Sequence, residues 1–136
     1  MTEVHFILHG AEAISGSFLA AAKGVDVELG KKVRHYGQLL RTRVMAKASG
    51  RPGPRSITGD YRRSWVLEYR GRGGGSTSTV GTSAPQGRRL EFGFHGMDSL
   101  GRNYNQPPYP HARPAFDETA PEFELAVTTM VGGFFR

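Results

Sequence analysis

The chain has 136 residues, a formal net charge of +6 and a sequence pI of about 10.1. This length suits one domain with a modest core, and the absence of cysteine excludes disulfides, thiolate nucleophiles and cysteine-ligated zinc. The basic balance fits a nucleic-acid partner, an acidic neighbour in an assembly, or a need to stay in solution, and charge leaves these three open.

The composition predicts a single domain over residues 1–136 with long irregular connections, because 19 glycines and 8 prolines interrupt regular structure. We expect irregular or mobile segments at about 49–57, 71–88 and 95–112. Glu3 stands where a secretory signal would carry Lys or Arg, and no apolar run approaches the roughly 18 residues of a membrane span. The expected setting is therefore a cytosol-like compartment with no membrane partner.

The first third of the chain predicts a short strand and a long amphipathic helix. Residues 4–8 alternate weakly as in a strand, and residues 11–23 predict a short alanine-rich helix that ends at Gly24. The clearest helix runs from about residue 26 to residue 48, with basic residues largely on its outer faces. Its apolar stripe recurs every three or four residues and consists of Leu29, Val33, Tyr36, Leu40 and Val44.

The prolines between residues 49 and 59 deny backbone donors and break regular structure. A single helical turn can follow at about residues 58–65, and it leads into a strand. In this strand Trp65, Leu67 and Tyr69 share one face, and we expect Trp65 to pack against the long helix.

The glycine- and hydroxyl-rich segment 71–87 predicts a mobile hairpin, of which residues 76–81 can join the sheet as a strand. Segment 88–94, RRLEFGF, then alternates between polar and apolar residues. The alternation puts three apolar residues on one face, namely Leu90, Phe92 and Phe94. This pattern predicts a third strand, antiparallel to the second.

A second amphipathic helix closes the chain. Thr119 and Glu122 have capping-box spacing, with Pro121 tolerated in a first turn that needs no intrahelical donors. The apolar stripe that follows consists of Phe123, Val127, Met130, Val131 and Phe134. The predicted fold class is therefore α+β, with a long amphipathic helix on a small, mostly antiparallel sheet, long loops and a C-terminal helix.

No catalytic constellation is evident in the sequence. The stretch GRGGGSTS has the glycines of a phosphate-binding loop but lacks its lysine. The most tempting metal group, His95 with Asp98 and His111, lies in a glycine-interrupted segment without the spacing that fixes ligands. Nothing sets the geometry of His95 with Glu91 or Asp117 as an acid–base pair. We expect no enzyme activity, no cofactor and no metal.

A small basic nucleic-acid-binding protein is an alternative reading. Arginines border the irregular segments, with Tyr61 and Tyr69 interleaved, which suits phosphate contact and base stacking. The arginines concerned are Arg51, Arg55, Arg62, Arg63, Arg70, Arg72, Arg88 and Arg89. The opposing interpretation is that they protect strand edges and pair with acids on neighbouring subunits.

Four short motifs follow one another in a distinctive order. They are Ile57–Trp65 with its Thr-Gly and Ser, Val80–Thr82, the Glu-Phe-Gly of Leu90–Gly93, and the proline-rich approach to Arg-Pro-Ala in Pro107–Phe116. In this order and spacing, residues 25 to 131 resemble the HK97 gp10-like family of tailed-bacteriophage neck and tail-completion proteins. In that family the Arg-Pro-Ala step starts the final helix.

The resemblance implies a non-enzymatic virion subunit that forms a ring at the head–tail junction, in six copies. The implied partners are further copies of itself, a tail terminator or tail-tube protein, and a head-closure or adaptor protein, with passive proximity to phage DNA in the channel. It implies a location in the neck of the virion, and in the host cytoplasm during assembly.

In this reading the segment after Phe94 is a docking loop, and residues 107–114 form a stiff extended strap that leads into the last helix. Its candidate partner contacts are Phe94, His95, Asp98, Arg102, Tyr104, Tyr109, His111 and Arg113. A candidate flexible interface loop consists of Arg70, Arg72, Arg88 and Arg89. Structural roles are expected for Thr58, Gly59, Ser64, Trp65, Glu91, Phe92, Gly93 and Pro114.

More specific expectations apply to six residues. Thr58, Gly59 and Ser64 are expected to cap and turn the chain into its strand. Arg113 is expected to pair with Glu91 or Asp117 at the start of the last helix. Phe134 and Phe135 fit either the core or an exposed tip, and the sequence leaves this choice open.

Overall fold

The structure is a computed structural model that describes residues 4–9, 19–72 and 75–134. In chain order the elements are β1 (Val4–His9), α1 (Leu19–Lys47), α2 (Asp60–Arg63), β2 (Val66–Arg72), β3 (Gly75–Thr82), α3 (Gly87–Phe92), β4 (Phe94–Met97), β5 (Asn103–Gln106) and α4 (Ala112–Phe134). A long helix, a small antiparallel sheet and a C-terminal helix confirm the α+β class.

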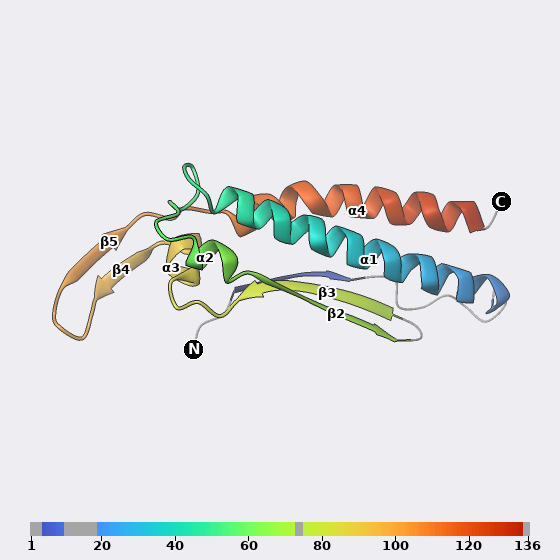
Figure 1. Cartoon of the computed structure of the whole chain (residues 1–136), viewed down its shortest axis with the longest axis horizontal. Helices are drawn as coiled ribbons and strands as arrows, with labels where there is room; N and C mark the ends of the chain where they lie inside the picture. Colours follow the sequence, from blue (N-terminus) through green and yellow to red (C-terminus); the bar gives the residue numbers. More distant parts are fainter. Residues whose placement is uncertain (1–3, 10–18, 73–74, 135–136) are drawn as a thin grey trace.

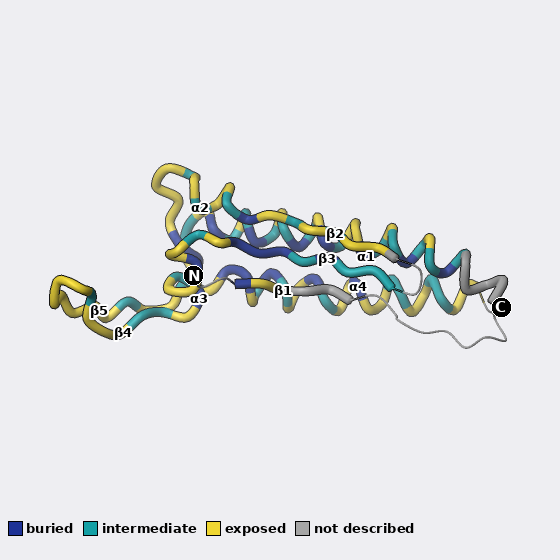
Figure 2. Tube along the Cα trace, turned by 90° about the horizontal axis from the view of Figure 1, so that it is seen from below, coloured by how far each residue is buried: buried dark blue, intermediate teal, exposed yellow. Residues whose placement is uncertain are grey.

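The main sheet has the strand order β1-β3-β2, with both pairs antiparallel. Both long helices cover the same face of this sheet, and they run antiparallel to each other (Figure 1). Helix α1 packs across β2 and β3, and α4 packs on α1 and β1. Strands β4 and β5 form a separate two-stranded sheet that projects away from the body beyond α2 and α3 (Figures 1 and 2). None of the helices in the described ranges combines the length and hydropathy that a membrane span requires.

The predicted apolar stripe of α1 forms the centre of the core. Leu29, Val33, Leu40 and Val44 are each fully buried or nearly so, and Tyr36 is half-buried with its ring edge-on to that of Phe123. Burying each aliphatic side chain of this kind contributes about 1.5–3 kcal/mol. This stripe therefore supplies much of the free energy that joins the helices to the sheet.

Several shorter elements are also as predicted. Strand β1 covers the expected residues, α2 is the single helical turn, and residues 49–57 contain neither helix nor strand. In β2, Leu67 and Tyr69 pack on the core while Val66 is exposed. Trp65 is fully buried, and its carbonyl accepts a hydrogen bond from Arg41 of α1 at 2.8 Å.

The prediction that Gly24 ends a helix is wrong, because α1 is continuous from Leu19 to Lys47. Residues 11–18 of the expected short helix lie outside the described residues. A Cβ at Gly24 would lie 2.7 Å from Cε1 of Phe134. The glycine therefore makes room for an aromatic ring of α4, and this packing outweighs its low helix propensity.

Segment 71–88 is not irregular, because most of it forms the end of β2 and the whole of β3. The strand expected at 76–81 is confirmed, and it is the central strand of the sheet. Its small residues let α1 approach closely. Ser78 is buried and donates a hydrogen bond to the carbonyl of Val33 at 2.7 Å, and a Cβ at Gly37 would lie 2.5 Å from Ser78 Oγ. The small residues of β3 suggested a loop in the sequence, but in the structure they are required for close packing of α1 on the strand.

The third strand expected at 88–94 is wrong, because Gly87–Phe92 forms helix α3. The backbone N–H of Leu90 donates to the carbonyl of Gln86 at 2.9 Å, as in a helical turn. The helix turns Glu91 into the interior and leaves Phe92 63% exposed, so the alternating apolar residues do not share a buried face. The strand begins only at Phe94, and it pairs with β5 instead of β2.

The capping box expected at Thr119 is also wrong, because α4 begins at Ala112, next to the Arg-Pro-Ala step. Thr119 is buried within the helix and donates to the carbonyl of Ala115 at 2.7 Å, and Pro121 lies inside the helix. Of the predicted stripe, Phe123 is buried, and Val127 and Met130 pack against the core. The ring of Phe134 lies over Gly24, while Phe135 lies outside the described residues.

Candidate functional site

A buried carboxylate holds the first turn of α4. Glu91 Oε2 accepts the backbone N–H groups of His111 and Ala112, each at 3.0 Å, and Oε1 accepts that of Arg113 at 2.9 Å. These N–H groups have no partner within the helix, and the helix dipole favours a negative charge beside them. Glu91 therefore caps α4 from another helix, and the expected link between Arg113 and Glu91 runs through the backbone of Arg113.

The imidazole of His111 is fully buried behind this cap. Its Nδ1 lies 2.8 Å from the carbonyl of Tyr109, which can only accept, so Nδ1 carries the proton. Its Nε2 then accepts the hydroxyl of Tyr61 at 2.6 Å. Burial lowers the pKa of His111 and outweighs the opposing effects of the Tyr109 carbonyl and Glu91, and burial also raises the pKa of Tyr61.

Four side chains connect α2, the start of β2, α3 and α4, and we call them the Glu91 cluster. They are Tyr61, Trp65, Glu91 and His111. The rings of Tyr61 and Trp65 meet the imidazole edge-on, with centroids 5.5 and 5.7 Å from it. Trp65 and His111 are fully buried and Glu91 is nearly so, which denies a substrate access to the carboxylate and the imidazole. The arrangement suits a structural joint, and it fixes the end of the molecule from which β4 and β5 project.

Residues 94–106, which comprise β4, β5 and their turn, form an arm that is anchored at its base. Gly93 precedes the arm with φ of 79°, and a Cβ there would lie 2.8 Å from the carbonyl oxygen of Gln106. The amide of Gln106 donates to the carbonyl of Arg89 at 3.2 Å, and the Arg89 guanidinium lies 4.2 Å from the ring centroid of Phe94. A glycine with positive φ and two contacts of Arg89, one with Gln106 and one with Phe94, therefore set the direction of the arm.

Asp98 organises the tip of the arm. Its Oδ1 accepts the backbone N–H groups of Leu100 and Arg102, each at 2.9 Å, and its Oδ2 accepts Nε of Arg102 at 2.6 Å and the hydroxyl of Tyr104 at 3.2 Å. These donors, above all the backbone N–H of Arg102, lower the pKa of Asp98. Gly101, with φ of 77°, completes the turn. The tip is thus held by its own hydrogen bonds.

The arm presents apolar side chains to solvent. Met97 is 65% exposed and Leu100 75% exposed, both at the tip, and Figure 2 shows the end of the arm as exposed. Segment 95–112 was expected to be irregular, and this is wrong, since most of it is a hairpin with a defined register. Met97 and Leu100 make the tip of the arm a candidate contact surface.

The predicted docking residues are brought together only in part. The arm carries Phe94, His95, Asp98, Arg102 and Tyr104. The other three lie at its base or behind it: Tyr109 lies under the Arg51 guanidinium at 3.7 Å, His111 is buried, and Arg113 pairs with Asp117 at 2.9 Å in α4. The expectation that the strap presents His111 at the surface is therefore wrong. The described residues contain no group of three or more metal-ligating acids or histidines, and His111 faces Tyr61 and Glu91.

The four arginines of the expected flexible interface loop do not form one surface. Arg70 and Arg72 lie near the C-terminal end of β2, whereas Arg88 and Arg89 lie in α3 at the opposite end of the sheet (Figure 1). The hairpin prediction placed them in one loop, and the intervening strand β3 separates them.

Thr58, Gly59 and Ser64 make local contacts around α2 that fit the turn expected there. Thr58 Oγ1 accepts the backbone N–H of Asp60 at 3.2 Å, and Gly59 has the left-handed φ of 83°. Ser64 Oγ donates to the carbonyl of Tyr61 and lies 2.7 Å from Thr82 Oγ1 in β3. Pro114 lies in the first turn of α4, where its missing N–H costs no hydrogen bond.

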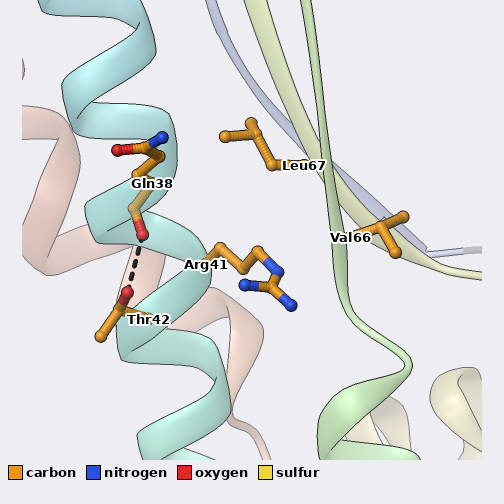
Figure 3. A pocket seen from close by; sticks show the side chains of 5 residues that line it. All are labelled: Gln38, Arg41, Thr42, Val66 and Leu67. Atoms are coloured by element: carbon orange, nitrogen blue, oxygen red, sulfur yellow. Dashed lines mark hydrogen bonds between the residues drawn. The ribbon is translucent and has the colours of Figure 1, made fainter.

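A cleft of about 550 Å³ opens between α1 and the edge strand β2. Figure 3 shows Arg41 reaching from α1 toward β2, beside Gln38 and Thr42, with Leu67 facing it. In the sequence, Arg41 is one of several basic residues on the outer faces of the helix, and nothing local distinguishes it. In the structure, its hydrogen bond to the carbonyl of Trp65 places it beside β2.

Comparisons of the chain with protein-family models, with curated proteins and with solved structures found no match. Sequence reasoning assigned a structural role to Glu91 but missed that its carboxylate caps α4. It also missed the pairing of Tyr61 with His111. The turn of the arm had a readable signal, because Asp98 with Gly101 three residues later is a common turn pattern.

Proposed function

We propose that this protein is a structural subunit of a tailed bacteriophage, which forms a ring at the neck and joins the tail to the head. The observation that carries the proposal is the arm, a hairpin held by its own hydrogen bonds, with Met97 and Leu100 exposed at its tip. A projecting, internally braced element with apolar ends suits insertion against a neighbouring subunit. The order of short motifs along residues 25 to 131 supports the same reading.

The arm also suits ring formation for a geometric reason. A ring needs a heterologous interface, in which one surface of a subunit meets a different surface of the next. The arm projects at one end of the molecule, and the long face of α1 and α4 lies elsewhere (Figure 1). An arm of one copy resting on the body of the next is such an interface. We infer a non-catalytic role, with tail-terminator or tail-tube and head-closure proteins as further partners in the virion.

The use of basic residues favours protein contact over nucleic-acid binding. Many of the cations are engaged within the chain by acids, including Lys31, Arg43, Lys47, Arg63, Arg70, Arg102 and Arg113. Three more arginines, Arg34, Arg51 and Arg89, stack on aromatic rings. These internal contacts leave fewer cations free for phosphate than the net charge of +6 suggests.

The test is light scattering of the purified protein, followed by electron cryomicroscopy of the virion neck with wild-type or variant protein. We expect a ring at the neck, and we expect Met97→Asp with Leu100→Asp to prevent its incorporation while leaving thermal unfolding unchanged. Ile57→Asp, an exposed apolar residue in the loop before α2 and outside α1 and α4, is the matched control. Incorporation of the arm variant as efficiently as the control would contradict the proposed role of the arm. Absence of the protein from the neck would overturn the assignment.

The nucleic-acid alternative has a separate test, the retention of the purified protein on immobilised DNA. Retention on duplex or single-stranded DNA, with a log–log salt slope of about 0.9 per neutralised phosphate, would favour it. No retention at roughly 50 mM salt would remove it.

A further inference from the structure

The structure assigns the β2 edge and its cleft with α1 as a docking site for an extended acidic segment of another protein. This inference is independent of the neck assignment, because it concerns a surface distinct from the arm. Strand β2 pairs with β3 on one side, and within the described part of the chain no strand pairs with its other side. An open edge carries backbone N–H and C=O groups that can bond an added strand.

The residues that line the cleft beside this edge determine which side chains of an added strand can bind there. An added strand would lie about 4.8 Å from β2, with alternate side chains on the helix side, as Leu67 is. Those side chains would enter the cleft of about 550 Å³ that α1 and β2 enclose. Arg41 is the one charged residue among the described residues that line it.

Arg41 makes the cleft suited to a carboxylate. Its Nε donates to the carbonyl of Trp65 at 2.8 Å, which fixes the guanidinium on the sheet side of α1. A guanidinium has five N–H donors in a fork that matches a carboxylate, and among the described residues no acid forms an ion pair with Arg41. The net charge of +6 adds long-range attraction for an acidic partner.

The described strands of a second copy do not supply the required acidic segment. Among the described strands, Glu68 is the one acidic residue, and it pairs with Arg70 at 2.7 Å. It also lies on the face opposite Leu67, away from the cleft. A nucleic acid is a poor fit, because one arginine in a cleft beside a strand edge offers no series of phosphate contacts. The partner chemistry that fits is an extended segment with an acidic side chain flanked by apolar or β-branched residues.

The test uses the full chain with two fluorescent peptides of alternating valine and threonine, one with a central glutamate and one with glutamine in its place. Fluorescence anisotropy measures affinity, and amide chemical shifts locate the site. We expect the glutamate peptide to bind about tenfold more tightly, with shifts along β2. The preference should disappear in Arg41→Gln and in Gln38→Glu, which places a competing carboxylate one turn from Arg41.

The controls separate loss of the site from loss of folding. Val27→Glu adds the same charge to an exposed position of α1 and should keep the preference, as should Arg62→Gln in α2. Equal affinity for both peptides, binding of neither, or a preference that survives Arg41→Gln would overturn the proposal. Displacement of the peptide by a single-stranded oligonucleotide would assign the cleft to nucleic acid. Self-association at β2 that Gln38→Glu abolishes would assign it to a second copy.

Discussion

Glu91 Oε2 lies 3.1 Å from Nδ1 of His111 and 3.0 Å from the backbone nitrogen of the same residue, with both side chains almost completely shielded from solvent. One carboxylate therefore lies beside a buried imidazole and caps the start of a helix. Because α3 leads directly into the arm, the joint that begins α4 also fixes the base of the arm. Stability and the geometry of the proposed interface depend on the same residue.

Glu91→Gln should lower the free energy of unfolding by about 3 kcal/mol, measured by urea denaturation. Glutamine is similar in size, but it removes the charge and turns one acceptor into a donor facing the N–H groups of α4. Glu124→Gln, an exposed position of α4, is the matched control and should change little. A loss of less than about 0.5 kcal/mol for Glu91→Gln would show that the cap contributes little.

The protein should become less stable as pH falls below about 6.5, the ordinary pKa of histidine in an unfolded chain. Because burial lowers the pKa of His111 in the folded state, the unfolded chain binds the proton first. Stability from this residue is complete above the unfolded pKa and is lost as pH falls toward the folded one, by at most about 1.4 kcal/mol per pH unit. Urea denaturation at several pH values between about 7 and 5 measures it.

His111→Asn should be less stable at neutral pH but should flatten this slope. His95→Asn, at an exposed position of the arm, should leave the slope as in the wild type. Equal slopes in the wild type and His111→Asn would assign the pH dependence to other groups.

The α1 stripe could be predicted because a period of three to four residues sustained over many turns leaves one interpretation. Helix α3 could not, because six residues with alternating apolar positions fit a strand as well as a helix, and the choice depends on where Glu91 finds its donors. The predicted helix end at Gly24 was wrong for a similar reason, since only the position of the Phe134 ring explains a glycine within α1.

The candidate site divides in the same way. Residues of the arm were identified because they lie close together in the sequence, from Phe94 to Tyr104. His111 was misplaced because a histidine among prolines has the composition of a surface loop, whereas Tyr61, 50 residues earlier, buries it. Local composition indicates that a segment is unusual, and tertiary contacts decide which of its side chains reach solvent.

Gly37→Ala should lower the free energy of unfolding by about 1–2 kcal/mol, although alanine is the better helix former. The added Cβ would lie 2.5 Å from Ser78 Oγ and 2.6 Å from Ser78 Cβ, so α1 must move off the central strand. Gly132→Ala in α4 is the matched control, because no atom lies within 4 Å of its added Cβ, and it should leave stability unchanged or raise it. Thermal and urea denaturation measure both. An increase in stability for Gly37→Ala would show that the space between α1 and β3 can accommodate an added methyl group.

Asp98→Ala should loosen the tip of the arm without unfolding the body. The carboxylate accepts four hydrogen bonds from three residues of the turn and β5, and the body shares none of them. Amide hydrogen exchange should accelerate at Leu100 and Arg102, while the urea midpoint of the whole chain stays as in the wild type. Asp117→Ala, which removes another exposed i,i+4 partner of an arginine, should leave exchange in the arm unchanged.

If the arm must be rigid before it meets a neighbour, Asp98→Ala should also reduce incorporation at the neck, although Met97 and Leu100 remain intact. Normal incorporation with a loosened tip would show that the arm orders on contact.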